Sequence, residues 1–179
     1  MGRRGVVAVA VRGVMAVIVL SAGLGAGASP TSAASEDGSA RAVLDGLPIA
    51  IGDISRYHCH DRAFPLIRCF HDSASRDLDE QTAPALKQSA GLSGTVTPYV
   101  RWYADGGLLG PSFSASIPYA NLGDVGWNDA ISSFSTYPGG HPRWSQDIGS
   151  GGTHWDWGFA SVTYVGDAAN DKFSSVERL

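Results

Sequence analysis

Two six-residue stretches of this 179-residue chain carry oxygen donors at the same spacing. Residues 128–133 read Asn-Asp-Ala-Ile-Ser-Ser, and residues 170–175 read Asn-Asp-Lys-Phe-Ser-Ser. Asparagine and aspartate favour turns, where they offer an amide oxygen and a carboxylate, and the serine three residues after the aspartate adds a hydroxyl. Calcium takes about six to eight oxygen ligands of these kinds in a flexible shell. Each stretch is therefore a candidate calcium-binding loop.

The segments that must position these loops are duplicated along the chain. An aromatic residue with a glycine seven positions later occurs at Tyr103 and again at Trp144, 41 residues further on. The two Asn-Asp pairs are 42 residues apart. Self-similarity at a fixed period indicates repeated structural units. We therefore expect two units, residues 97–137 and 138–179.

Both units read as strands. Residues 112–117 and 153–157 alternate polar with apolar side chains, which is typical of half-buried antiparallel strands, and glycine and proline separate such runs. Four short strands per unit predict a mainly β fold, in which two Greek-key motifs form a two-sheet sandwich around one core. The predicted core residues are Val100, Trp102 or Tyr103, Phe113, Ile117, Ile131, Phe134, Trp155, Trp157, Phe173 and Val176.

The repeated aromatic-to-glycine corner and the two Asn-Asp-x-x-Ser-Ser stretches together resemble the βγ-crystallin family over residues 97–179. The resemblance implies a non-enzymatic protein with two calcium ions, each held where the Asn-Asp loop of one unit meets the serine of the other. It assigns to the metal the side chains of Asp129, Ser132, Asp171 and Ser174, the backbone carbonyls of Ala130, Lys172, Ala104 and Ser145, and Asn128 and Asn170 as ligands or as residues that orient the loops.

The same residue types also occur at ordinary turns and strand starts, and this would explain a single such stretch. Two matching stretches in an acidic chain favour calcium. We expect the second site to be the weaker, because Lys172 places a cation beside it and residues 167–169 lengthen the loop before Asn170. At the affinity typical of extracellular modules, a Kd of about 10⁻⁴–10⁻³ M, calcium would stabilise the fold.

The beginning of the chain predicts export. Residues 1–34 have a basic start, an apolar run and a small-residue end, as in a secretory signal peptide, and Arg12 leaves the run too short for a membrane-spanning helix. Removal of this segment takes away three arginines and no acid, so the formal net charge falls from −4 to −7. We expect a secreted monomer, with calcium ions and an unidentified extracellular protein as partners, and neither a nucleic-acid groove nor membrane attachment after cleavage.

Two further segments precede the repeats. Residues 35–48 are small and polar and predict a flexible leader, whereas residues 49–96 predict a small cystine region and a linker. Between Asp72 and Gly91 the pattern favours a short helix, capped by Asp72 or the following serine, that ends or restarts at Pro84.

The two cysteines, Cys59 and Cys69, lie in this cystine region. In an exported chain two cysteines most simply form a disulfide. His58, His60 and His71 lie close by and raise the alternative of a zinc site, but the Cys-x-x-Cys pairs typical of structural zinc sites are missing. The spacing favours the disulfide.

An enzyme finds little support in the sequence. Ser132, His154 and Asp156 could form a triad, but no Gly-x-Ser-x-Gly elbow is present. The acids within residues 77–80 are better explained by the helix macrodipole than by acid–base catalysis. Two other functions stay open: a secreted peptidase inhibitor or toxin-like protein that presents the loop 138–142, and a structural protein of the cell envelope or spore coat.

Overall fold

The computed structural model describes residues 39–89 and 97–179. The predicted signal peptide (1–34), the start of the predicted leader (35–38) and most of the linker (90–96) lie outside the described residues. The N-terminal elements are β1 (Arg41–Leu44), β2 (Leu47–Ile49), the 3-10 helix η1 (Ile51–Arg56), β3 (His58–Ala63), β4 (Leu66–Phe70) and α1 (Ser73–Ser89). The C-terminal elements are β5 (Val100–Asp105), β6 (Leu109–Ala115), η2 (Leu122–Val125), β7 (Ser133–Thr136), β8 (Pro142–Asp147), η3 (Ile148–Ser150), β9 (Gly151–Asp156) and β10 (Ser175–Arg178).

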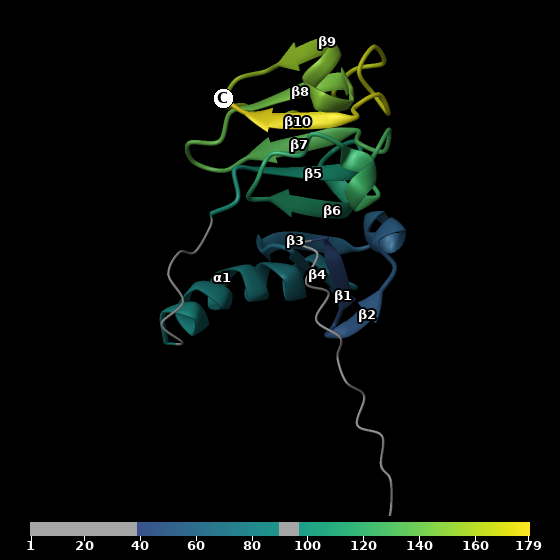
Figure 1. Cartoon of the computed structure of the whole chain (residues 1–179). Helices are drawn as coiled ribbons and strands as arrows, with labels where there is room; N and C mark the ends of the chain where they lie inside the picture. The colour runs from purple at the N-terminus through teal and green to yellow at the C-terminus, as the bar shows by residue number, and fades with distance from the viewer. Residues whose placement is uncertain (1–38, 90–96) are drawn as a thin grey trace, which may run out of the picture. The chain divides into compact units, whose positions relative to one another are not determined.

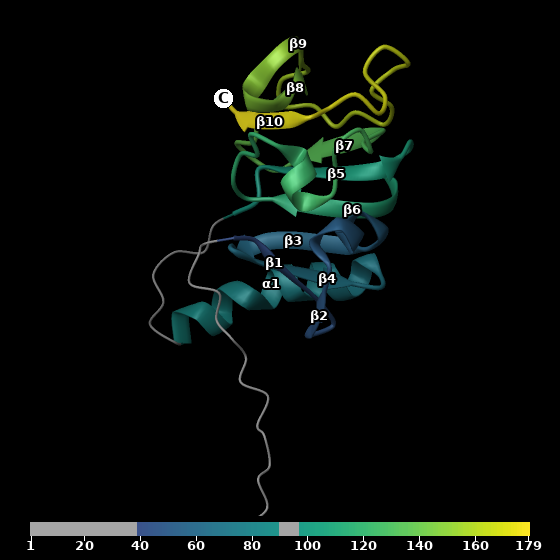
Figure 2. The same cartoon turned by 45° about the vertical axis from the view of Figure 1, so that its right-hand side comes forward.

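The strands form two sheets, one of seven strands in the order β2-β1-β4-β3-β6-β5-β7 and one of three strands in the order β10-β8-β9. Within the first sheet β1 runs parallel to β4 and β3 runs parallel to β6, whereas the other pairs are antiparallel. Both ribbon views show β3 beside β6 (Figures 1 and 2). The N-terminal strands therefore continue the sheet of the first repeat, and the predicted cystine region shares that sheet.

Each repeat contributes three strands where the sequence predicted four. The missing fourth strand is reduced to a single residue that bridges to the other repeat: Tyr119 pairs with Val176, and Val162 pairs with Phe134. Each bridge is made by two backbone hydrogen bonds of 2.8–3.0 Å. The two Greek keys thus each lend a residue to the other's sheet, which is why they share one core.

The prediction of an unstructured leader through residue 48 is wrong for its described part, because β1 and β2 form a hairpin there. The turn between them is Asp45-Gly46, with φ values of 48° and 89°. Asp-Gly is a favoured dipeptide for a two-residue hairpin turn, since both positions need positive φ. Ala42 on β1 is buried opposite Ile67 of β4. The Asp-Gly pair was the signal in the sequence that could have revealed this hairpin.

The core is largely aromatic. Trp102 lies 4.9 Å from Phe113 and within 6.1 Å of three more aromatic rings, measured between ring centroids. Of the predicted core residues, the structure buries Val100, Trp102, Phe113, Ile131, Phe134, Phe173 and Val176 and leaves Tyr103, Ile117, Trp155 and Trp157 half-buried. Trp127 and Trp144 are fully buried although the sequence analysis did not include them.

The predicted disulfide joins Cys59 and Cys69, which face each other across β3 and β4. Both residues are buried and belong to the same hydrophobic cluster as the tryptophans. The core of the repeats therefore extends into the cystine region. The bridge excludes both cysteines as thiolate ligands, so the Cys/His zinc alternative loses its sulfur donors.

Helix α1 begins as predicted but ends later. The Ser75 N–H donates to the Asp72 carboxylate over 2.8 Å, which makes Asp72 the capping residue and lowers its pKa. The helix then continues through Pro84 to Ser89. A proline leaves the carbonyl four residues earlier without its helical partner. Here that carbonyl belongs to Glu80, and it accepts a hydrogen bond from the Arg62 guanidinium, so the helix is not interrupted.

The acids of α1 are not a helix-start cluster, because the first turn holds no acidic residue. Asp77, Asp79 and Glu80 instead form ion pairs with arginine and histidine side chains, most of them on the seven-stranded sheet. The explanation by the macrodipole was therefore wrong, and these side chains attach the helix. Within residues 39–89 and 97–179, no helix combines the length and apolar character needed to cross a membrane.

Asp61 of β3 connects the N-terminal strands to the first repeat. Its carboxylate is about 1% exposed and accepts hydrogen bonds from the Ser116 N–H (2.7 Å) and the Tyr119 hydroxyl (2.8 Å). Burial disfavours the charged form and raises the pKa of Asp61 above its ordinary value of 3.8, although these hydrogen bonds oppose the shift.

We predict that Asp61→Asn removes a loss of stability that the wild-type protein undergoes as the pH rises toward neutral. A raised carboxyl pKa in the folded state means that the wild-type contribution is fully present below pH 3.8 and is lost as pH rises through the folded pKa. The stability of wild type relative to Asp61→Asn should therefore fall between pH 4 and pH 7. Denaturant unfolding of both proteins at a series of pH values measures this, and a constant or rising difference would contradict it.

Candidate metal centre

The two Asn-Asp loops have the same backbone conformation. Asp129 and Asp171 both have φ 53°, in the left-handed region that aspartate tolerates better than most residues. In each loop the preceding asparagine donates its side-chain N–H to the aspartate carboxylate, over 2.6 Å from Asn128 and 2.7 Å from Asn170. The duplicated sequence therefore forms a duplicated local structure.

Backbone hydrogen bonds cross-connect the two loops. The Asp129 N–H donates to the Phe173 carbonyl over 3.1 Å, and the Asp171 N–H donates to the Ile131 carbonyl over 3.4 Å. Phe173 directly precedes Ser174, and Ile131 directly precedes Ser132. Each aspartate is thus placed beside the serine of the opposite repeat.

The second serine of each motif holds a hairpin corner. Ser133 donates to the Asp105 carbonyl over 2.5 Å and accepts from the Leu108 N–H over 3.1 Å. In the other repeat Ser175 donates to the Asp147 carbonyl over 2.7 Å and accepts from the Ser150 N–H over 3.0 Å. The sequence analysis gave these serines no role, and their buried hydroxyls stabilise the corners beside the candidate loops.

The structural repeat is 42 residues in the corner strands and the Asn-Asp loops, so the alignment of Tyr103 with Trp144 was wrong by one position. Trp102 pairs with Phe134 and Trp144 with Val176, and both tryptophans are fully buried. Tyr103 therefore corresponds to Ser145. The period of the buried strand residues would have given the correct register.

This shift changes one predicted ligand pair. The β5–β6 ladder is interrupted between Tyr103 and Asp105, and the β8–β9 ladder between Ser145 and Asp147. A bulge leaves its extra residue outside the ladder. The registers place the extra residue on the partner strand, so that Ala104 faces residues 110 and 111, and residue 146 faces residues 152 and 153. The counterpart of the Ala104 carbonyl is thus that of Gln146, whereas the Ser145 carbonyl accepts the Ser174 N–H over 3.0 Å.

The candidate ligands differ in exposure. Asn128, Asp129, Asp171 and Lys172 are exposed, and Ala104, Ala130, Ser132, Asn170 and Ser174 are half-buried. The side-chain oxygen of Asn170 is buried and has no hydrogen-bond partner among the described residues. A buried amide oxygen that accepts no hydrogen bond is suited to coordinate a cation. The donors present are all oxygens, which suits calcium or another hard cation.

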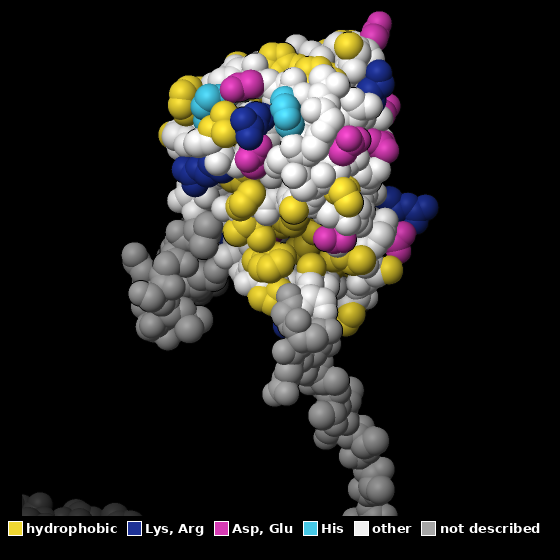
Figure 3. All heavy atoms as spheres, turned by 45° about the horizontal axis from the view of Figure 1, so that its top comes forward, with side chains coloured by type: hydrophobic (Ala, Val, Ile, Leu, Met, Phe, Trp, Pro, Cys, Tyr) yellow, Lys and Arg dark blue, Asp and Glu magenta, His cyan; other side chains and the backbone are white. Residues whose placement is uncertain are grey.

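Carboxylates are sparse around these loops. The described residues contain no group of three or more histidine, cysteine or acidic side chains that could hold a metal. On the face of the molecule drawn in Figure 3, acidic side chains lie singly or in small groups. Any ion at either loop would depend mainly on neutral oxygens, which is consistent with the weak affinity expected from the sequence.

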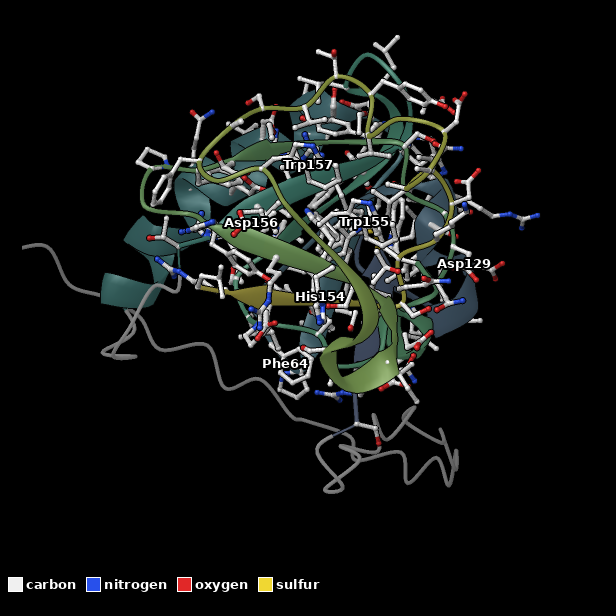
Figure 4. The ribbon with its side chains drawn as sticks, turned by 90° about the horizontal axis from the view of Figure 1, so that it is seen from above. Phe64, Asp129, His154, Trp155, Asp156 and Trp157 are labelled. Carbon is white, nitrogen blue, oxygen red and sulfur yellow. A yellow bond between two sulfur atoms is a disulfide. The ribbon has the colours of Figure 1, made fainter. Side chains whose placement is uncertain are left out.

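The residues of the imagined catalytic triad have other partners. His154 is 3.0 Å from the Ser145 hydroxyl, and Asp156 is 2.6 Å from His141. The pKa of Asp156 is lowered because the Gly158 N–H and then His141 donate hydrogen bonds to it. In the view from above, His154 and Asp156 lie on β9 while Asp129 lies at the edge of the molecule (Figure 4).

The loop 138–142 is held against the domain. Its Gly140 is buried, and a side chain there would collide with the Tyr99 carbonyl. The Leu179 N–H donates to the His141 carbonyl over 2.9 Å, and Arg178 donates to the Gly139 carbonyl over 3.1 Å. Only residues 138 and 139 are exposed, so the loop presents little surface to a peptidase.

One cavity lies where the N-terminal strands meet the first repeat. It has a volume of about 610 Å³ and is lined by apolar groups that include Ile51, Phe64 and Ile117, with Asn121 and Asp124 among its polar residues. Phe64 is 43% exposed. The sequence analysis missed this cavity, because it depends on the packing of two segments that are about 60 residues apart.

The similar solved structures each match somewhat less than half of this chain. No family model and no curated protein matches the chain. Among solved structures, a βγ-crystallin from an archaeon is 29% identical, with a TM-score of 0.42, and the match covers 46% of this chain and 99% of that one. A βγ-crystallin domain from Clostridium beijerinckii is 27% identical, with a TM-score of 0.41, over 45% of this chain and 95% of that one. A clostrillin double mutant in complex with nickel is 26% identical, with a TM-score of 0.40, over 46% and 98%.

The assignment rests on the molecule's own features. Its sequence motif repeats at 42 residues, its two Greek keys each lend a bridging residue to the other, and its two corners are held by equivalent serines. We therefore assign residues 97–179 to a fold of two Greek-key motifs that share one core.

Proposed function

We propose that this is an exported, non-enzymatic calcium-binding protein, in which two ions occupy the paired Asn-Asp loops and stabilise the fold. The observation that carries the proposal is the cross-connection of the two loops. Through it Asp129 lies beside Ser174, and Asp171 lies beside Ser132, each with the same left-handed backbone. Residues 1–34 supply the export signal in this proposal.

The donors for each ion come from both repeats. The first ion would be held by the Asp129 carboxylate, the Ala130 carbonyl and the Ser174 hydroxyl. The second would be held by the Asp171 carboxylate, the Lys172 carbonyl and the Ser132 hydroxyl. The corner carbonyls at positions 104 and 146 are further candidates. Calcium supplies binding free energy to the folded state alone, about 1.4 kcal/mol per site at tenfold excess over Kd.

The two loops are not equivalent. The side-chain oxygen of Asn170 is buried without a hydrogen-bond donor among the described residues and could coordinate the second ion, whereas Asn128, its counterpart in the first loop, is exposed. Lys172 is exposed, so solvent and salt screen its charge from Asp171. We expect both loops to bind calcium and the second to bind it more weakly, because Lys172 places a cation beside Asp171. The Asn170 oxygen and the screening of Lys172 keep this difference in affinity small.

Thermal unfolding with and without calcium tests the proposal. We expect millimolar calcium to raise the melting temperature of wild type by a few °C over a chelator-treated sample. Asp129→Asn and Asp171→Asn keep a residue that tolerates positive φ but remove the charge, and each should lose about half of the shift. Asp53→Asn, an acid in η1, is the matched control and should retain the full shift. No shift in wild type, or an equal shift in the Asp129→Asn/Asp171→Asn double variant, would contradict it.

A further inference from the structure

The seven-stranded sheet has a polar face opposite the aromatic core. Side chains alternate along β3, so Cys59 and Asp61 point to the core side, whereas His58, His60 and Arg62 point to the other side. Arg68 of β4 and Arg101 of β5 share that second face, because both contact α1. We call the five side chains at positions 58, 60, 62, 68 and 101 the basic face.

Helix α1 lies on the basic face and meets it with acids (Figures 1 and 2). Arg101 is 2.9 Å from the Asp77 carboxylate and 2.9 Å from the Glu80 carboxylate. The Asp79 carboxylate is 2.7 Å from Arg68 and 2.8 Å from His60. Three acids within four helical positions therefore match charges that come from three different strands.

Among the described side chains of α1, apolar contact contributes little to this interface. Leu78, which lies between the paired acids, is 62% exposed and points away from the sheet. Glu80 and His60 are buried, so desolvation offsets much of the attraction in their ion pairs. Salt screens the more exposed pair of Arg68 with Asp79. The helix is therefore held mainly by ion pairs, and another acidic segment could form the same pairs.

The helix does not cover the basic face completely. A cavity of about 380 Å³ on one part of the interface is lined by Arg62, Arg101 and Tyr137. A second cavity of about 250 Å³ is lined by His58, Arg76 and Arg101. Arg101 lines both cavities with a side chain that is 16% exposed, and Arg68, at 37%, is the most exposed arginine of the basic face.

We propose that the basic face binds an acidic polypeptide segment and that α1 is its internal occupant. The partner must carry carboxylates at a spacing close to that of Asp77, Asp79 and Glu80, since these match the face in the chain itself. A tethered helix has an effective concentration of roughly millimolar, so a free segment of equal affinity binds poorly while α1 is in place. This proposal does not depend on calcium.

The test uses the full chain and a fluorescent peptide with the sequence of residues 73–89. In the Asp77→Asn/Asp79→Asn/Glu80→Gln variant, α1 loses its charges, and we expect the peptide to bind at least roughly tenfold more tightly than to wild type. Adding Arg101→Gln should abolish that binding, as should about 0.5 M NaCl. Arg143→Gln, which removes an arginine paired with Glu177 on the other sheet, is the matched control and should leave binding unchanged.

Hydrogen exchange on wild type gives a second readout that needs no variant. The α1 amides should exchange at least about tenfold faster in 0.5 M NaCl than in 0.02 M NaCl, while the β5 amides stay protected. The proposal is overturned if α1 exchange ignores salt, or if the peptide binds equally with and without Arg101. Binding of polyphosphate to the variant without binding of the peptide would overturn the choice of partner.

Discussion

Replacing Trp102 with alanine is expected to reduce the free energy of unfolding by about 3–5 kcal/mol. Trp102 is fully buried and contacts the rings of Phe113, Tyr119, Trp127 and Trp144. Its removal leaves a cavity shared by both sheets, which the surrounding rings cannot fill without leaving their own contacts. Denaturant unfolding followed by tryptophan fluorescence measures the loss.

Two further variants make this result specific. Trp102→Phe keeps most of the ring and removes an indole N–H that has no partner among the described residues, so its loss should be less than half that of alanine. Trp157→Ala removes a half-buried indole at the margin of the core and should also cost less. An equal loss from Trp157→Ala and Trp102→Ala would contradict a core centred on Trp102.

Loss of the disulfide is expected to cost about 2.5 kcal/mol. Cys59 and Cys69 are 10 residues apart, and closing a loop of that length removes roughly this much conformational freedom from the unfolded chain. Cys59→Ala/Cys69→Ala changes little volume, so the unfolding free energy of this variant should report mainly the bridge. Chemical denaturation of wild type and variant gives the difference.

Reduced wild type serves as the control for this second prediction, and it should unfold at the same denaturant concentration as the double variant. The calcium response should be unchanged in both, since the bridge joins β3 and β4 and the candidate loops lie in residues 128–133 and 170–175. A reduced protein as stable as the oxidised one would show that the bridge does not constrain the unfolded chain.

The sequence predicted the C-terminal fold because its signals are local and occur twice. These signals are the alternating strand pattern, the glycine at each corner and the Asn-Asp turn, and each depends on only a few neighbouring residues. Because each occurs in both repeats, a chance match is improbable. The one-residue error at Tyr103 arose because the alignment used the aromatic residue seven positions before a glycine, which pairs Gly110 with Gly151, whereas the glycine with the same left-handed backbone is Gly152. Burial, which only the structure shows, identifies Trp102 and Trp144 as the equivalent pair.

The N-terminal part was harder to predict because its strands depend on distant partners. The parallel pairing of β3 with β6 joins Cys59 to Phe113, more than fifty residues away, and no local pattern specifies it. The continuation of α1 through Pro84 likewise needs Arg62, which satisfies the carbonyl that the proline leaves free. The Asp45-Gly46 dipeptide could have predicted the hairpin turn, but it lies in a stretch whose small, polar residues favoured a flexible leader.

The candidate site shows the same division. The Asn-Asp loops could be identified from the residues themselves. That each aspartate lies beside the serine of the other repeat is known only from the backbone hydrogen bonds to Phe173 and Ile131. That the Asn170 oxygen accepts no hydrogen bond among the described residues could not be foreseen, since asparagine side chains at turns usually find a donor. These two features turn a pair of motifs into a testable metal centre.

A crystal structure grown in millimolar calcium, with the ions located by anomalous scattering, tests the central claim most directly. The account predicts two ions, one beside Asp129 and Ser174 and one beside Asp171, Ser132 and the Asn170 oxygen. Crystals that contain calcium at several times the expected Kd of about 10⁻⁴–10⁻³ M, but show no ion at either loop, would contradict it.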